Sequence, residues 1–299
     1  LPTWIGWYAH QLPQGFQEYS VLAVFVIQLI VPFFIFGPGR IRYAAASILI
    51  AFQFLIILTG NYCFFNILTI ALCLLLFDDA VFNKCFPKKW RITFSEVRSR
   101  IPKWKKFFVE GMGQGVLAIS FLLYIIPLFV SPVSYPSIFI NTVNTIRPFH
   151  IVNQYGLFAV MTTSRPEIFI AGSNDGQEWK TYGFKWKPED LNKAPAFVAP
   201  HQPRLDWQMW FAALSNYERN PWLIQFMIRL LQGSPPVLDL LASNPFPEKP
   251  PKYIQAVVYD YWFTDAETRN KTGNWWHRED KGFYTPVLQL PSGPATGGE

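Results

Sequence analysis

The chain has few of the side chains that form disulfides or bind metals. Its three cysteines are Cys63, Cys73 and Cys85. None lies in residues 135–299, which excludes disulfide bonds and a Cys-x-x-Cys redox centre from that region. Its four histidines are His10, His150, His201 and His277. They are far apart and form no His-x-x-x-His pair, so we expect neither a metal site nor a cofactor.

The chain also lacks the sequence signatures of common enzymes. No Gly-x-Ser-x-Gly motif occurs, so nothing indicates the nucleophile elbow of an α/β-hydrolase. No glycine-rich loop of the phosphate-binding kind is present either. We therefore predict no catalytic residues and favour a non-enzymatic role.

Charged side chains are absent from the long run of residues 43–77. A bilayer core of about 30 Å is crossed by about 20 apolar residues in a helix. The run is therefore long enough for two crossings. It is interrupted at Thr59-Gly60-Asn61, where a turn forms easily. The pattern predicts a transmembrane hairpin.

Two further uncharged stretches flank this hairpin. Together they predict a transmembrane helical region over residues 1–134, with helices over about 20–36, 43–58, 61–77 and 112–133. The remaining residues, 135–299, are enough for one domain with its own core. The expected fold class is an α+β membrane protein: a transmembrane helical bundle followed by a β-rich, β-sandwich-like domain with a few helices.

Charge is unevenly distributed along the chain. Residues 135–299 hold 15 basic and 15 acidic residues, so the net charge of +6 comes from residues 1–134. Most of those basic residues lie in the segment 84–106, as expected for a short cytoplasmic loop. The distribution argues against nucleic acid as a partner and favours membrane lipids. It places residues 135–299 on the extracytoplasmic side. A phosphate-binding role for the basic loop is the alternative.

Strand patterns dominate the second half of the chain. A hairpin is expected where strands over 167–171 and 179–186 flank the turn residues 172–176, which include Asp-Gly. Further strands are expected at 150–152, 157–161 and 253–263. Helices are expected at 221–231, which has proline at its first position, and at 236–242.

The segment His201–Ala213 is the most distinctive of the second half. It places two opposite charges among aromatic residues, and its candidate client- or ligand-binding residues are His201, Arg204, Asp206, Trp207 and Trp210. Arg204 and Asp206 are expected to pair, because a buried charge needs a hydrogen-bonded partner. The segment is either a structural corner that joins sheet to helix or a binding site for a partner protein or a lipid headgroup.

Four polar residues stand out in the membrane region: Asn61, Asn66, Asp78 and Asp79. A polar side chain within a membrane helix usually pairs with another helix or marks a functional site. Asn66 fits both readings. The two aspartates are expected at the cytoplasmic interface, solvated or paired with the basic loop.

These motifs together resemble the lipase maturation factor family. The similarity is carried by Arg204-Leu-Asp-Trp with Met209-Trp-Phe-Ala-Ala, and by Thr59-Gly-Asn with Phe65-Asn-Ile-Leu-Thr and Phe77-Asp-Asp. Further matches are His150-Ile-Val-Asn-Gln-Tyr-Gly, Asn244-Pro-Phe and Trp275-Trp276. His201-Gln-Pro before the arginine is similar to bacterial members. The family's amino-terminal helices are expected to be missing from this chain.

The resemblance implies a multi-spanning membrane protein that helps exported lipases reach an active fold in the secretory pathway. Its partner would be an exported client protein. Its location would be the endoplasmic reticulum membrane in a eukaryote or the cytoplasmic membrane in a bacterium. The alternative is a membrane-embedded enzyme that acts on a lipid or lipid-linked substrate, with Asn66, Asp78 or Asp79 in its site. A scaffold that recruits other membrane proteins is a third reading.

Overall fold

The computed structural model describes residues 1–79, 81–82, 102–129, 136–152 and 162–291. The chain forms two compact units. One contains residues 1–88 together with 163–299, and the other contains residues 89–162. Among the described residues, three helices are long and apolar enough to cross a membrane: Gln14–Phe36, Gly39–Thr59 and Lys103–Ile125.

The first candidate span is made of two helices. The α-helix α2 (Gln14–Leu29) is followed by the 3-10 helix η1 (Val31–Phe36). Pro32 lacks a backbone N–H and its ring clashes with the carbonyl four residues earlier, so the α-helical bonding stops before it. The span begins earlier than the expected residue 20, because hydropathy marks the apolar core of a helix and not its polar first turns.

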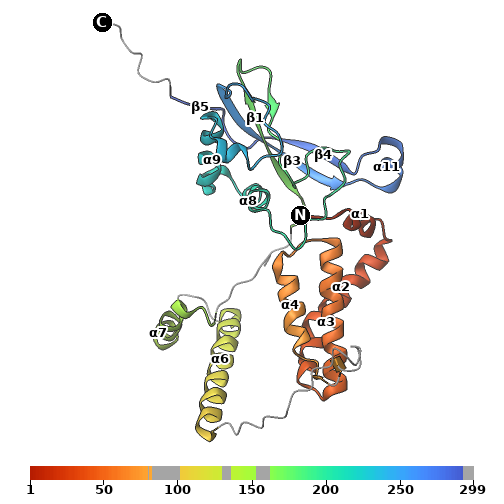
Figure 1. Cartoon of the computed structure of the whole chain (residues 1–299), viewed down its shortest axis with the longest axis vertical. Helices are drawn as coiled ribbons and strands as arrows, with labels where there is room; N and C mark the ends of the chain where they lie inside the picture. Colours follow the sequence, from red (N-terminus) through yellow and green to blue (C-terminus); the bar gives the residue numbers. More distant parts are fainter. Residues whose placement is uncertain (80, 83–101, 130–135, 153–161, 292–299) are drawn as a thin grey trace, which may run out of the picture. The chain divides into compact units, whose positions relative to one another are not determined.

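The predicted hairpin is formed by two helices that lie side by side (Figure 1). The helix α3 spans Gly39–Thr59 and its partner α4 spans Phe64–Leu74. With 11 residues, about 16 Å, α4 is short for a bilayer core. Bonds to the third preceding carbonyl at Leu75, Leu76 and Phe77 extend it by one tighter turn. Residues 61–77 are therefore a shorter element than the expected crossing.

The second unit contains the third candidate span. The helix α6 runs over Lys103–Phe129, followed by α7 (Ser137–Ile146) and the 3-10 helix η4 (Arg147–Phe149). Lysines at 103, 105 and 106 extend α6 beyond the expected residue 112, since lysine is a good helix former. The strand predicted at 150–152 is wrong, because His150 ends η4 in the left-handed region with φ 51°.

The described part of the second half holds a five-stranded antiparallel sheet. Its strands are β1 (Pro166–Ser173), β2 (Lys180–Thr181), β3 (Tyr253–Phe263), β4 (Trp276–Phe283) and β5 (Leu288–Gln289). Their order is β2-β1-β3-β4, and β5 also pairs with β3. The hairpin predicted around Asp-Gly forms, but its second strand covers only Lys180–Thr181 instead of residues 179–186. In its turn, Asp175 accepts the N–H groups of Gln177 and Glu178 at 2.9 Å.

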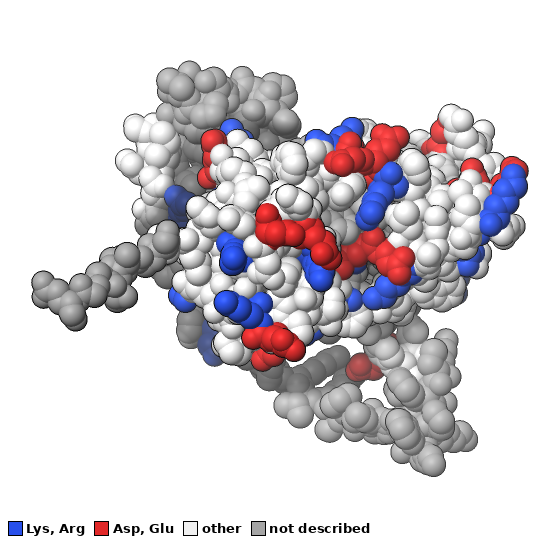
Figure 2. Space-filling model, turned by 90° about the horizontal axis from the view of Figure 1, so that it is seen from above, with Lys and Arg blue, Asp and Glu red and all other residues white. Residues whose placement is uncertain are grey.

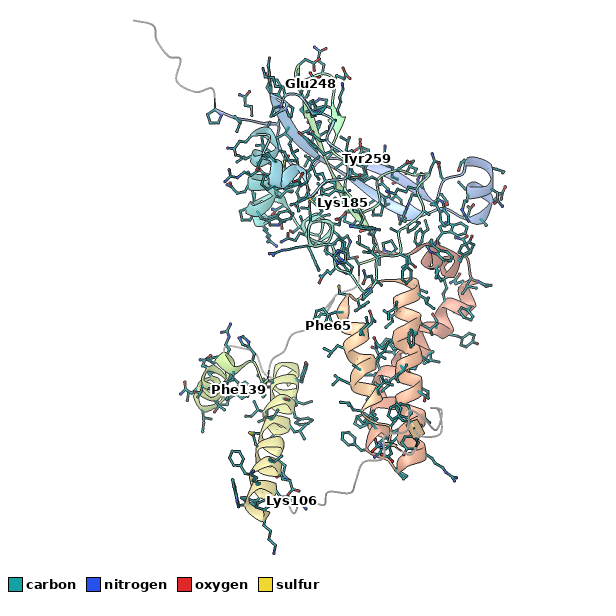
Figure 3. All side chains as sticks on the ribbon, in the orientation of Figure 1. Phe65, Lys106, Phe139, Lys185, Glu248 and Tyr259 are labelled. Carbon is teal, nitrogen blue, oxygen red and sulfur yellow. The ribbon has the colours of Figure 1, made fainter. Side chains whose placement is uncertain are left out.

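Helices cover one face of this sheet (Figures 1 and 3). Alternate residues of β1 and β3, such as Ile168 and Ile254, point to this face because strand side chains alternate. They pack on Met209 of α8 (Arg204–Ala213) and on Leu223 and Met227 of α9 (Pro221–Leu231). A sandwich needs a second sheet. In the described residues this place is taken by helices, because 204–213 and 221–231 have helical rather than alternating apolar spacing.

The opposite face of the sheet is aromatic. Phe169, Tyr261 and Trp276 are buried there, with Tyr259 and Phe263 half-buried beside them. The loop between β2 and α8 contributes Leu191 to this cluster. Charges of both signs are interspersed on the outer surface seen in Figure 2.

The smaller helices are α1 (Trp4–His10), η5 (Tyr217–Arg219), α10 (Pro235–Leu238) and α11 (Ala266–Thr272). The helix predicted at 236–242 is therefore present but shorter. The predicted strand 157–161, most of the basic segment 84–106 and Cys85 lie outside the described residues.

Candidate functional site

The tip of the α3–α4 hairpin is bonded to the sheet domain through Asn61. This side chain is buried, and its Nδ2 donates to the backbone carbonyl of His201 at 2.9 Å. Its Oδ1 accepts the N–H of Cys63 at 2.7 Å, which supports a positive φ of 59° at that residue. Two of the sequence candidates, Asn61 and His201, are thereby brought together although 140 residues separate them.

Asn66 lies in the first turn of α4 and is also buried. Its Nδ2 donates to Oε1 of Gln53 on α3 at 2.8 Å. Its Oδ1 accepts the N–H of Tyr62 at 3.1 Å. Both polar ends of the amide therefore have partners within the hairpin, a contact of the kind that packs two membrane helices together.

The helix α1 lies against both the hairpin and the sheet domain. Thr3 Oγ1 donates to the carbonyl of Leu58 at 2.5 Å, and Gly6 approaches the carbonyl of Thr59 closely. On the other side, Trp7 Nε1 donates to Thr264 Oγ1 at 3.3 Å. Three parts of the chain, α1, the hairpin tip and the end of β3, therefore form one bonded joint.

The carboxylate of Asp206 is a structural acceptor at the start of α8. It is 3% exposed, and its Oδ1 accepts the backbone N–H groups of Trp186 and Lys187 at 2.8 and 2.9 Å. Arg204 is exposed, and the expected pair with Asp206 is not among the ion pairs of the described residues. That prediction is wrong because two N–H donors of the neighbouring loop satisfy the carboxylate instead.

The two tryptophans of the segment lie on α8 itself. Trp207 is buried, and its ring is 5.9 Å from the half-buried Trp210, centre to centre, in an edge-to-face arrangement. The side chain of His201 is exposed. The side chains of His201 and Arg204 are therefore exposed and that of Trp210 is half-buried, while Asp206 and Trp207 are buried.

A buried ionic network next to this segment was not predicted. Glu167 of β1 is fully buried, with Arg165 Nη2 at 2.9 Å and Lys187 Nζ at 3.8 Å from its oxygens. Lys187 Nζ also lies 3.4 Å from Glu189 and 4.2 Å from the ring centre of Phe169. Burial raises the pKa of Glu189 above its usual value, although Lys187 opposes the shift. The sequence signal for this network was the charged residue Glu167, which directly precedes the apolar strand residues Ile-Phe-Ile-Ala.

Asp78 and Asp79 lie at the other end of the hairpin, both exposed. Asp78 pairs with Arg42 at 2.7 Å and accepts the hydroxyl of Tyr43. Arg42 and Gln53, the α3 partners of Asp78 and Asn66, are separated by about 16 Å of helix. The structure therefore does not bring Asn66 together with the aspartates.

No group of three or more metal-binding side chains occurs among the described residues.

What the joint can do chemically is bind and position. It fixes the sheet domain on the hairpin and leaves His201 and Arg204 accessible next to it.

Two family profiles match the chain. Residues 1–84 match the lipase maturation factor transmembrane domain, and residues 151–286 match the lipase maturation factor C-terminal domain. The Asn61–His201 bond therefore joins the two matched regions. No solved structure matches the chain.

Curated relatives agree with these profiles. The chain is 34% identical to lipase maturation factor 1 of Mus musculus, over 97% of this chain and 53% of that protein. It is 32% identical to lipase maturation factor 2 of Gallus gallus, over 97% of this chain and 54% of the relative. The chain thus spans about half the length of these relatives. With both family profiles matched in order, this chain belongs to the lipase maturation factor family of membrane proteins.

Proposed function

We propose that the protein assists the folding of exported proteins at the membrane surface, with lipases as its clients. Support for lipases comes from the names of the relatives. The observation that carries the proposal is the joint, in which Asn61 and α1 hold the sheet domain directly on the membrane hairpin. A domain fixed in this way acts on chains as they emerge from the bilayer.

The direction of the hairpin supports an extracytoplasmic sheet domain. The hairpin tip and α1 contact this domain, while Arg42 and Asp78 lie at the opposite end of α3. The basic segment follows Asp78 in the sequence, and positive loops stay on the cytoplasmic side. We infer that residues 135–299 form the extracytoplasmic domain and residues 1–134 the membrane region. The membrane would be that of the endoplasmic reticulum in a eukaryote and the cytoplasmic membrane in a bacterium.

We further propose that clients contact the exposed side chains of His201 and Arg204 together with Trp210. Aromatic and arginine side chains dominate the binding energy of many protein interfaces. Asp206 and Trp207 hold this surface in place. Among the described residues, nothing favours the alternative of a membrane-embedded enzyme, because Asn66 is satisfied within the hairpin and lies far from Asp78 and Asp79.

The test is co-expression of the full-length protein with a secreted lipase of the same organism. The yield and specific activity of the secreted lipase are compared with and without the maturation factor. We expect the active fraction to fall several-fold without it, with inactive lipase retained in the cell. Unchanged activity of every secreted lipase would contradict the client assignment.

The proposed contact surface is tested in the same cells with Arg204→Glu and His201→Ala. We expect reduced lipase activity at unchanged abundance of the membrane protein. Arg219→Glu is the matched control, since Arg219 is an exposed arginine in η5, away from the joint. Equal effects of Arg204→Glu and Arg219→Glu would remove Arg204 from the client surface.

A further inference from the structure

The short helix α1 has two differently occupied sides. Its inner side binds protein: Trp7 and Gln11 donate to Thr264 at 3.3 and 3.0 Å, and Thr3 donates to Leu58. A neighbouring side carries Trp4 and Tyr8, which are 44% and 50% exposed and one helical turn apart, although the hydroxyl of Tyr8 also accepts a bond from Arg269. Leu12 and Phe16 continue the exposed apolar side chains toward α2, at 40% and 57%.

The position of α1 relative to the candidate spans is fixed by contacts. Gly6 lies against the carbonyl of Thr59, the last residue of α3. At its other end, α1 stops at His10, four residues before α2 begins at Gln14. The helix therefore bridges the ends of two membrane-crossing helices on the side where the sheet domain is attached.

The composition of this segment fits the boundary between headgroups and acyl chains. No Asp, Glu, Lys or Arg occurs between Leu1 and Gln17. Tryptophan and tyrosine are enriched at this boundary because their rings are apolar with one polar group. In bulk water, four large apolar side chains would be solvated, which is unfavourable. In the acyl core, the backbone polar groups at the helix ends would lack hydrogen-bond partners.

The same helix is coupled to α11 of the sheet domain through Arg269. The guanidinium carbon of Arg269 lies 3.5 Å from the ring centre of Trp275 and 4.5 Å from that of Trp7. Its Nη1 donates to the hydroxyl of Tyr8 at 3.3 Å. The ring of Trp7 also packs against Trp275, with 5.4 Å between centres. Binding of α1 to the bilayer therefore also restrains the end of the sheet that carries Arg269 and Trp275.

We propose that α1 is an interfacial anchor, in which Trp4 and Tyr8 insert among the lipid headgroups of the leaflet on the sheet-domain side. The lipid surface is the occupant because α1 is continuous with α2 and lies on the end of α3. The anchor fixes the tilt of the sheet domain over the bilayer through the Arg269 cluster. This inference rests on the membrane spans and not on the identity of any client.

The test is photocrosslinking in the full-length protein in native membranes. Benzoylphenylalanine replaces Trp4 or Tyr8, and the membranes contain an alkyne-tagged phospholipid. Phe283 is the matched control position, because it is an aromatic residue that is 75% exposed at the far end of β4. That end lies about 23 Å along the strand from Trp276.

We expect lipid adducts at positions 4 and 8 to exceed those at position 283 several-fold. Lipid adducts no more frequent than at 283, or adducts at position 4 mainly with another segment of this protein or with another protein, would overturn the proposal. If substitution at 4 or 8 prevents membrane insertion, Leu12 provides a further position in the same exposed series. There, a nitroxide label on Leu12→Cys reports oxygen accessibility, and we expect accessibility greater than that of the same label at position 283.

Discussion

Because Gly6 has no side chain, α1 can lie close to the end of α3. A Cβ atom built on Gly6 would lie 2.5 Å from the carbonyl oxygen of Thr59. That is well inside van der Waals contact, and the obstacle is backbone that cannot rotate away. We therefore expect Gly6→Ala to destabilise the protein by about 1–3 kcal/mol, the usual cost of overpacking. Thermal unfolding in mild detergent measures the loss.

The matched control for this change is Gly15→Ala. Gly15 lies in the first turn of α2 and has no atom within 4 Å of the Cβ position. Alanine is favoured over glycine in helices, so we expect this variant to be neutral or slightly more stable. If both variants unfold at the temperature of the parent protein, α1 does not pack on α3 as the structure has it.

Glu189 makes the stability of the sheet domain depend on pH in a defined direction. Burial raises its pKa above the usual value, with Lys187 opposing. A carboxyl whose pKa is higher in the folded state favours folding most below its unfolded pKa. Its contribution then declines as pH rises through the raised value. We therefore expect the unfolding temperature of Glu189→Gln, relative to the parent protein, to increase between pH 4 and pH 7.

Subtracting the parent protein at each pH removes the effects of the other titrating groups. Glu248→Gln, at an exposed position outside the ionic network, controls for the loss of one negative charge. A relative unfolding temperature of Glu189→Gln that falls with pH would show that the attraction of Lys187 outweighs the burial of Glu189, and a constant one would show that Glu189 is solvated instead of buried.

Between elements, Asp206 connects the segment His201–Ala213 to a neighbouring loop through two hydrogen bonds. Its carboxylate accepts two backbone N–H groups of the loop that precedes Pro188, so α8 and this loop are bonded through one side chain. In Asp206→Ala both donors lose their acceptor in a buried place, which costs roughly 2–4 kcal/mol. Asp206→Asn keeps a carbonyl oxygen and is expected to lose less.

Thermal unfolding of the two Asp206 variants measures this difference. If the protein matures lipases as proposed, secreted lipase activity should fall in parallel with stability when Asp206 is structural. Should Asp206→Asn retain parent stability but lose all maturation activity, Asp206 would instead contact the client directly.

Elements with regular spacing were predictable from the sequence, and contacts between distant residues were not. The helix at 221–231 and the strand at 253–263 were predicted at their observed bounds, because proline, glycine and alternating side chains mark them. A β-sandwich was expected because strand patterns dominate the second half of the chain. In the structure, α8 and α9 cover the face of the sheet on which a second sheet would pack. Opposite charges two residues apart suggested the Arg204–Asp206 pair, yet side chains two apart on a helix do not face each other.

The candidate site was predictable in part for the same reason. His201 and Asn61 were both singled out, but their bond joins residues 140 positions apart and no local pattern reports it. The network of Arg165, Glu167, Lys187 and Glu189 is likewise assembled from a strand and a loop. Its members look like ordinary surface charges in the sequence, and only the apolar neighbours of Glu167 indicate burial.

At the scale of the whole molecule, the joint requires that α1, the hairpin tip and the sheet domain lie on one side of the membrane. A helix that crosses a bilayer has its two ends on opposite sides, so Arg42 and Asp78 then lie on the other side. Cys85 follows Asp78 closely in the sequence. The sidedness of two cysteines therefore tests the architecture without any assumption about clients.

We expect a cysteine introduced by Asn270→Cys on α11 to react with an impermeant maleimide from the extracytoplasmic face only. Asn270 is exposed in the sheet domain, whereas Cys63 and Cys73 are buried and are expected to react from neither face. Cys85 should react only when the cytoplasmic face is opened, for example in inside-out vesicles. Modification of positions 85 and 270 from the same face would mean that α3 and α4 do not cross as a hairpin. The joint would then hold the sheet domain on the cytoplasmic side, where it cannot meet an exported client.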